Sequence, residues 1–471
     1  MTMLQTGPLT DAVRAWEDDP GPPPSTRIPI FRPRPDLART PLPVDIATAA
    51  PTPDSDQPGT PEFRYWNLAE SLRRAADLWG QLIPPDATWH PTVGPVLTAT
   101  LDDGDDLNAY YDRAGLRFFH HTVAGVTVYS GESPDVVCHE AGHAVLDALQ
   151  PHLWDVASAE AAAFHESFAD ISAVLSGLQL ESLRVEMIAE THGQIARSSQ
   201  ISRLAEQLGW AIRQISPNAV EPDCLRNAAN RFFYRDSAEL PPSAPASELS
   251  SEPHSFSRVF TGAALRALSG IFHKQTRHDP DALRQASLDL GRLLAAGVQS
   301  APVVPSYYAQ VAAHMLLADQ TLLSGRYGRP LRAAFVRHGI LSPATATSLT
   351  PQVLAPHVRV IGETRPTLGA LSTMTVPGVT YGLTQPFEVH IPTNEGRFAV
   401  AGASTDTGSL SAAEGERTAM SFVEDLFRQG RVAVIEEYLT DSSSVVAEPR
   451  LYTHEIAPRD GRLMLVRRLF D

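Results

Sequence analysis

The sequence predicts an α+β protein with a β-rich N-terminal lobe, a mainly helical lobe and an extra small α+β domain at its C-terminal end. Alternating apolar and polar residues, which are typical of strands, concentrate between residues 93 and 130. Helical periodicity prevails from Ser133 to about Ile340, and short alternating runs return after Ser342. Because 43% of the 471 residues are hydrophobic and 20% are charged, the chain can bury a large core.

The first 61 residues contain 14 of the 39 prolines, in clusters such as PGPPP and RPRPDL, and lack sustained apolar periodicity. We expect residues 1–61 to form an extended, largely disordered leader. A plain solvated tail accounts for this composition, and an arm for docking or export is the alternative.

The next segment is expected to begin with a helix near Tyr65, because Leu68, Leu72 and Leu78 recur at helical spacing. Three strand-like runs follow: VGPVLTATLD, NAYYDRAGLRFFHH and VAGVTVYS. The DRAG tetrad between two aromatic runs predicts a turn within a hairpin.

Residues 62–341 are predicted to form one domain, divided into a β-rich lobe over 62–144 and a helical lobe over 145–341. A Ser/Pro/Glu-rich stretch, residues 240–253, predicts a flexible loop within the helical part. Residues 342–471 are expected to be a separate α+β domain of unknown role. Its strand-like runs are VRVIGE, FEVHIP, RFAVAG and RLMLVRRLF, and ERTAMSFVEDLFRQ has the pattern of an amphipathic helix.

Charge and cysteine content exclude several classes of function. A formal charge of −16 without any basic run argues against nucleic acid as a partner. Two cysteines, Cys138 and Cys224, exclude a disulfide framework and a four-cysteine zinc module, and leave one disulfide open. No apolar run is long enough to span a membrane, and no secretory signal is visible. We therefore expect a cytoplasmic protein by default, with signal-independent export as the alternative; the sequence predicts no particular oligomeric state.

Residues 139–143 read His-Glu-Ala-Gly-His, within a stretch expected to be a buried helix. Since residues four apart project from the same face of a helix, His139 and His143 can bind one metal ion. Glu140 lies beside the remaining coordination position, where it can take a proton from a water activated by the metal. Two helix histidines satisfied by ordinary hydrogen bonds are the structural alternative.

A second motif, FHESFADI, supplies the further groups that such a centre needs. Glu166 is the candidate third ligand. Asp170 lies one helical turn later and could accept the free N–H of a metal-binding imidazole. A solvated acidic pair on an amphipathic helix is the alternative interpretation.

Together these residues resemble the thermolysin family of metallopeptidases, the gluzincins, in which HExxH is followed about twenty residues later by ExxxD. The resemblance covers residues 65 to 341 and implies a Zn²⁺-dependent peptidase acting on a peptide or protein substrate. By resemblance, Arg226 in DCLRNA binds the substrate carbonyl and His254 in EPHSFSRVFTGAAL stabilises the oxyanion. In LNAYYDRAG, Asn108 and the backbone of Ala109 would pair with an extended substrate.

The sequence departs from the family at several points. Trp154 stands where the family has a tyrosine that donates to the oxyanion; its indole N–H could substitute, or the ring could serve packing alone. Asp135 matches a calcium ligand, but Gly177 falls where another calcium carboxylate is expected, so a complete calcium site is not predicted. The signal and inhibitory propeptide usual in the family are not visible either.

The resemblance places Val136 and Leu225 in the pocket for the residue after the scissile bond, which implies cleavage before bulky apolar residues. The chain has no phosphate-binding loop of the membrane-bound HEAGH proteases, and Leu146 and Leu149 exclude the class with a third histidine. Without the Gly-x-Met-Glu-Asn loop of related aminopeptidases, the expected enzyme is an endopeptidase. The alternatives are a noncatalytic binding protein of the same fold and a peptidase toxin or effector delivered to another cell.

Overall fold

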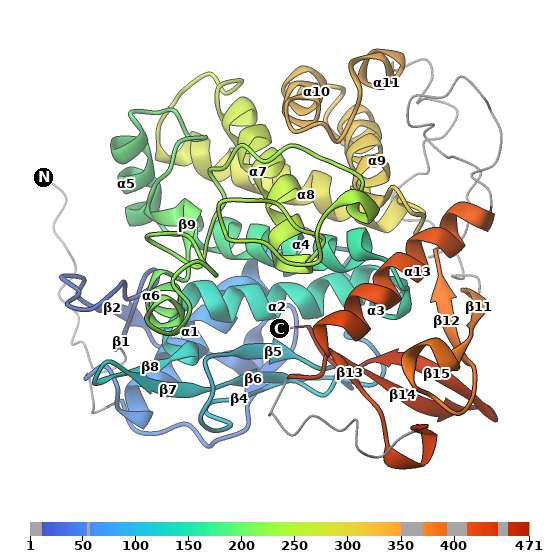
Figure 1. The fold of residues 1–471 in the computed structure, drawn as a ribbon. Helices are drawn as coiled ribbons and strands as arrows, with labels where there is room; N and C mark the ends of the chain where they lie inside the picture. Colours follow the sequence, from blue (N-terminus) through green and yellow to red (C-terminus); the bar gives the residue numbers. More distant parts are fainter. Residues whose placement is uncertain (1–11, 54–56, 350–370, 393–411, 441–450, 471) are drawn as a thin grey trace, which may run out of the picture.

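The computed structural model describes residues 12–53, 57–349, 371–392, 412–440 and 451–470 (Figure 1). It confirms the α+β class, because long helices and several small sheets make up the described chain. A four-stranded sheet and a hairpin precede the main group of helices, and a five-stranded sheet follows them. No helix among the described residues has the length and hydropathy to cross a membrane.

The stretch before the first long helix is ordered where the structure describes it, contrary to the expectation of a disordered leader. Strands β1 (Ala12–Ala15) and β2 (Ile30–Pro33) form an antiparallel pair, and β3 (Val44–Ile46) joins the four-stranded sheet. Asp19 is fully buried and accepts hydrogen bonds from the Ser133 hydroxyl and the Gln207 N–H. The high proline content led to the prediction of disorder. That prediction was wrong because apolar side chains between the prolines, such as Val13, are buried in the folded protein.

The β-rich part consists of helix α1 (Pro61–Gly80) packed near a sheet with strand order β3-β4-β6-β5. Thr60 caps α1 by accepting from the Phe63 N–H, and Pro61 begins it. The sheet strands are β4 (Leu97–Thr100), β5 (Ala109–Tyr111) and β6 (Leu116–Phe118), and the hairpin strands are β7 (His120–Val123) and β8 (Val126–Tyr129). The predicted DRAG turn connects β5 to its antiparallel neighbour β6, which leaves β5 at the edge of the sheet.

Helices α2 (Pro134–Leu149) and α4 (Ala159–Gly177) form the centre of the helical part, and every residue of both is buried. They approach each other closely at Gly142. A methyl group there would lie 2.9 Å from the Cα of Ala169 and 2.7 Å from the Cβ of Ser172. The glycine therefore fixes a short separation between the two helices that carry the predicted ligands.

The remaining helices surround this pair (Figure 1). They are α3 (His152–Asp155), α5 (Glu181–Thr191), α6 (Glu206–Ile215), α7 (Pro253–Phe272), α8 (Pro280–Ser300), α9 (Tyr307–Leu322), α10 (Gly328–Arg337) and α11 (Pro343–Ser348). Two short strands, β9 (Arg203–Leu204) and β10 (Arg226–Asn227), pair between α5 and α7. The two cysteines are both buried and unpaired, so they form no disulfide with each other.

The last part of the chain forms a sheet with strand order β11-β12-β15-β14-β13 and the helix α13 (Ala412–Gln429). The strands are β11 (Ser372–Val376), β12 (Phe387–Ile391), β13 (Val432–Ala433), β14 (His454–Arg459) and β15 (Arg462–Arg467). The predicted strands VRVIGE and RFAVAG lie outside the described residues. This C-terminal unit contacts the rest of the molecule; for example, the Ala157 N–H donates to the His390 carbonyl (2.8 Å).

Candidate metal centre

The HEAGH pentad lies in the second and third turns of α2. Ser133 caps this helix by accepting from the Val136 N–H, and Pro134 occupies its first position. The helical spacing brings the Nε2 atoms of His139 and His143 to 3.1 Å from each other. Both rings are buried, with 8% and 0% exposure. Two imidazole nitrogens that converge in this way suit a shared cation.

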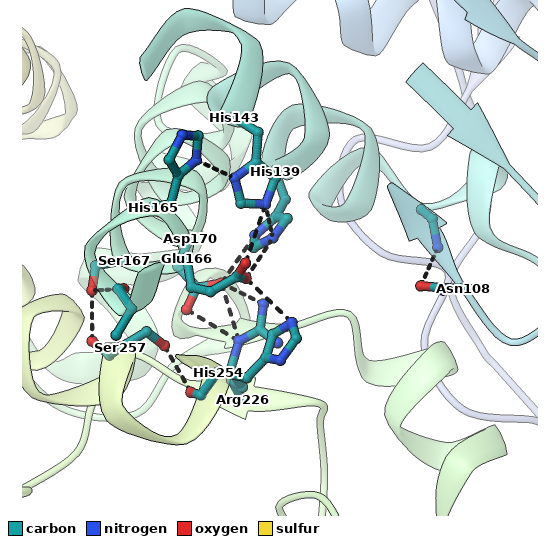
Figure 2. A network of polar contacts seen from close by, with 12 residues as sticks. Asn108, His139, His143, His165, Glu166, Ser167, Asp170, Arg226, His254 and Ser257 are labelled. Carbon is teal, nitrogen blue, oxygen red and sulfur yellow. Dashed lines mark hydrogen bonds and ion pairs between the residues drawn. The ribbon is translucent and has the colours of Figure 1, made fainter. Parts of the chain in front are cut away.

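Glu166, on α4, completes the group. Its carboxylate oxygens lie 3.4 Å from Nε2 of His139 and 3.6 Å from Nε2 of His143. One oxygen, Oε2, accepts no hydrogen bond of regular geometry although it is buried. The candidate ligand atoms of these three residues all lie within 4.8 Å of one another (Figure 2). The three side chains could therefore bind a metal ion, and they are the only such group of His, Cys, Asp and Glu among the residues that the structure describes.

Asp170 orients the first histidine from the side opposite the ligand atoms. Its carboxylate lies 3.1 Å from Nδ1 of His139 and also accepts from Arg226, whose Nη2 is 2.8 Å away. Burial works against the charged carboxylate, but Arg226 and His139 hold the pKa of Asp170 well below its usual range. A carboxylate in this position fixes the His139 ring with Nε2 toward the metal group.

His165, which the sequence analysis did not identify, has the equivalent position beside His143. The Nδ1 atoms of the two rings are 2.9 Å apart. Burial first, and then the charge of Arg467, keep the pKa of His165 well below its usual value, so the ring is neutral and can accept at Nδ1. If a metal binds Nε2 of His143, the proton of that ring is on Nδ1 and is donated to Nδ1 of His165. In the sequence, only the position of His165 directly before the candidate ligand Glu166 could have indicated this role.

Replacing His165 tests this orienting role. We expect His165→Leu to lower the affinity for a divalent cation such as Zn²⁺ about 10- to 100-fold, because the hydrogen bond to the candidate ligand His143 is lost. His165→Asn is the matched control, since its amide oxygen can still accept, and should lose less. Competition with a chromophoric chelator measures both affinities. Equal affinity of His165→Leu and the unchanged protein would show that the contact does not matter for metal binding.

His254 lies in the first turn of α7, with its side chain 26% exposed. Nε2 is 3.3 Å from Glu166, and Nδ1 is 2.7 Å from Glu252, the residue that caps α7. Burial opposes protonation, but the charges of Glu166 and Glu252 outweigh it and raise the pKa of His254 to about 10. The imidazole is therefore a cation beside the metal group. Glu252 was not singled out in the sequence, although a carboxylate two residues before the histidine was visible there.

A cavity of about 390 Å³ opens beside this cluster. Glu140, Asp170, Arg226 and His254 line it, and so do the four predicted substrate-binding residues Asn108, Ala109, Val136 and Leu225. Figure 2 shows Asn108 across from the group formed by His139, Glu166 and His254. Leu204, Leu208, Ile212 and Val220 add apolar wall. The cavity therefore joins a charged end at the metal group to an apolar pocket.

Trp154, the candidate second oxyanion donor, does not line the cavity. Its ring lies 5.6 Å from that of Tyr111 and 5.3 Å from that of Phe470, measured between centroids, and the Arg113 guanidinium lies over it at 4.6 Å. It is 3% exposed. The indole ring therefore packs against its aromatic neighbours. Of the two roles considered from the sequence, donation to the oxyanion and packing, this position fits packing.

Asp135, the match to a family calcium ligand, is buried beside two further acidic residues. It accepts from the Ala205 N–H (3.1 Å). Burial first, and then the neighbouring Asp18 and Asp19, raise the pKa of Asp135 well above its usual value. This carboxyl lies at the start of α2, beside Asp18 and Asp19 of the N-terminal segment.

With this geometry in view, the chain was compared with known proteins. Neither the models of protein families nor the curated proteins include a match to it.

Proposed function

We propose that the protein is a zinc-dependent peptidase with a thermolysin-like two-lobed fold. The observation that carries the proposal is the close grouping of His139, His143 and Glu166, of which His139 lines the cavity together with Glu140. Two imidazoles and one carboxylate, with a further carboxylate beside them, are the donor set of hydrolytic zinc sites. The cavity has walls from both the β-rich segment and the helices after α2, as the cleft of a two-lobed enzyme would.

In this proposal His139, His143 and Glu166 hold the zinc, and Asp170 and His165 orient the two imidazoles. Bound zinc supplies a water of lowered pKa, near 7, and polarises the substrate carbonyl. Glu140 accepts a proton from the attacking water and passes it to the leaving amine. Its place one residue from His139, on the cavity wall, suits this task.

The substrate would be held by groups around the same cavity. Asn108 and the backbone of Ala109 bind the extended chain, and Arg226 orients the carbonyl. His254, a cation held by Glu252, stabilises the negative charge that develops on the carbonyl oxygen. The apolar wall near Val136 and Leu225 accepts the side chain after the scissile bond, so we expect cleavage before bulky apolar residues.

Removal and return of the metal test the proposal. We expect a chelator to lower hydrolysis of a mixed peptide library at least about tenfold and added Zn²⁺ to restore it. Mass spectrometry of the products should show cleavage before residues such as Leu and Phe. Protein that is loaded with zinc and hydrolyses none of the peptides would support the noncatalytic alternative instead. Cleavage dominated by charged residues at that position would contradict the assigned pocket.

A further inference from the structure

The outer edge of β5 is already occupied beyond Ala109 by a segment of the chain itself. The Tyr111 N–H donates to the Phe470 carbonyl (3.0 Å), and the Phe470 N–H donates to the Tyr111 carbonyl (2.9 Å). The two residues form an antiparallel bridge. The chain reaches β5 from β15, which ends at Arg467 (Figure 1). It therefore lies along the strand edge that a substrate would use.

The register decides how much of that edge remains. Along a strand, the backbone groups of alternate residues face the same edge, so Ala109 faces the side on which Phe470 pairs with Tyr111. A peptide that pairs antiparallel with β5 passes Tyr111 first and Ala109 next. It then reaches the cavity wall formed by Asn108, His139 and Glu140. The residue opposite Tyr111 would belong to the N-terminal part of the substrate, and Phe470 holds that place.

Phe470 is firmly anchored. Its ring stacks on His165 at 3.7 Å and faces His143 at 5.3 Å, both between centroids, and the side chain is 2% exposed. The Arg467 guanidinium lies 4.0 Å from the Phe470 ring, and its Nε donates to the Trp154 carbonyl (3.2 Å). A side chain buried in this way is a fixed part of the molecule and not a readily displaced plug.

The rest of the C-terminal unit reaches the other side of the cavity. The Ser251 hydroxyl donates to Asp425 of α13 (2.6 Å), and the Gln429 amide donates to the Pro242 carbonyl (2.9 Å). Arg431, two residues after the end of α13, lines the cavity itself. The unit is thus attached both to β5 and to the loop that precedes α7, so it spans the cavity between them.

We infer that residues 467–470 close the cleft on the side that receives the N-terminal part of a substrate. This inference rests on the proposed peptidase function. A substrate could then place only the residue opposite Ala109 and the one before it ahead of the scissile bond. The enzyme would remove short segments from the amino end of peptides and would not cut inside long chains. The absence of the aminopeptidase loop motif predicted an endopeptidase. The closed cleft instead implies an enzyme that accepts only a short substrate segment before the scissile bond.

A peptide series tests the inference with the zinc-loaded full chain. The peptides share one Ala-Leu bond and differ in whether one, two or six residues precede that bond. We expect kcat/KM to fall at least about tenfold between the second and the third peptide. If the third peptide were cleaved as efficiently as the second, the closed cleft would be wrong, but the proposed peptidase function would still hold. No cleavage of any peptide would overturn the proposed function itself, and the inference with it.

Shortening the chain provides the second test. The measured quantity is the ratio of kcat/KM for the longest peptide to kcat/KM for the shortest. We expect this ratio to be at least about tenfold higher in a chain that ends at Arg467 than in the full chain. Because Phe470 packs on His165, the zinc content of both proteins is measured, and rates are expressed per bound zinc. Arg462→Ala is the matched control in the same unit, since its side chain is 69% exposed. An unchanged ratio in the shortened, zinc-containing protein would contradict a block by these residues.

Discussion

Glu140→Gln is expected to lower kcat for peptide hydrolysis about 10³-fold while the protein keeps its zinc. The amide has nearly the shape of the carboxylate but cannot take a proton from water. Glu140 is not one of the three grouped ligands, and it is 3% exposed on the cavity wall. Steady-state rates and zinc content, measured on the same preparation, therefore separate loss of the base from loss of the metal.

Glu132→Gln is the matched control for that variant. Glu132 is also a buried carboxylate close to α2, but it accepts the Gly59 N–H and does not line the cavity. Its replacement should leave kcat within about a factor of three. If Glu140→Gln hydrolysed peptides as fast as the unchanged protein, the proposed base would be wrong. If both variants lost activity equally, a general structural effect would explain the result.

Glu166→Gln is expected to lower zinc affinity more than about 100-fold. Loss of a residue that only hydrogen-bonds to a metal ligand typically lowers metal affinity 10- to about 100-fold, and Glu166 is itself a proposed ligand. The carboxylate is the only negative ligand in the group, and it lies within 3.6 Å of both imidazole Nε2 atoms. A neutral amide removes this charge from the coordination sphere. Chelator competition, or calorimetry on metal-free protein, measures the change.

The same helix offers a control for this second variant. Glu160 lies on α4 and is equally buried, but it accepts from the Tyr308 N–H and the Tyr234 hydroxyl, away from the metal group. Glu160→Gln should keep the zinc affinity of the unchanged protein, although its stability falls. Full zinc occupancy in Glu166→Gln at stoichiometric metal would remove Glu166 as the third ligand.

The sequence was most informative where the signal is local. The spacing of four between His139 and His143, and again between Glu166 and Asp170, is a property of one helix turn and needs no tertiary information. The same pentad also contains Gly142, whose missing side chain lets α2 and α4 approach. The α+β class, and the mainly helical character of the chain between Ser133 and about Ile340, followed from periodicity for the same reason.

Contacts between distant parts of the chain left no such signal. Phe470 stacks on His165 across about three hundred residues, and nothing in the alternation of RLMLVRRLF distinguishes this phenylalanine from a core residue. The leader was misjudged for a related reason. Composition describes how a segment behaves alone, whereas Asp19 and Val13 are buried by partners elsewhere in the chain.

The place of Asp19 has a consequence for how the molecule assembles. Its two partners, the Ser133 hydroxyl and the Gln207 N–H, are synthesised more than a hundred residues later, so the segment around β1 must wait for them as the chain grows. Phe470 reaches His165 later still. Such long loop closures slow folding. The surroundings of the candidate metal ligands are therefore completed only after residues about three hundred positions further along the chain have been synthesised.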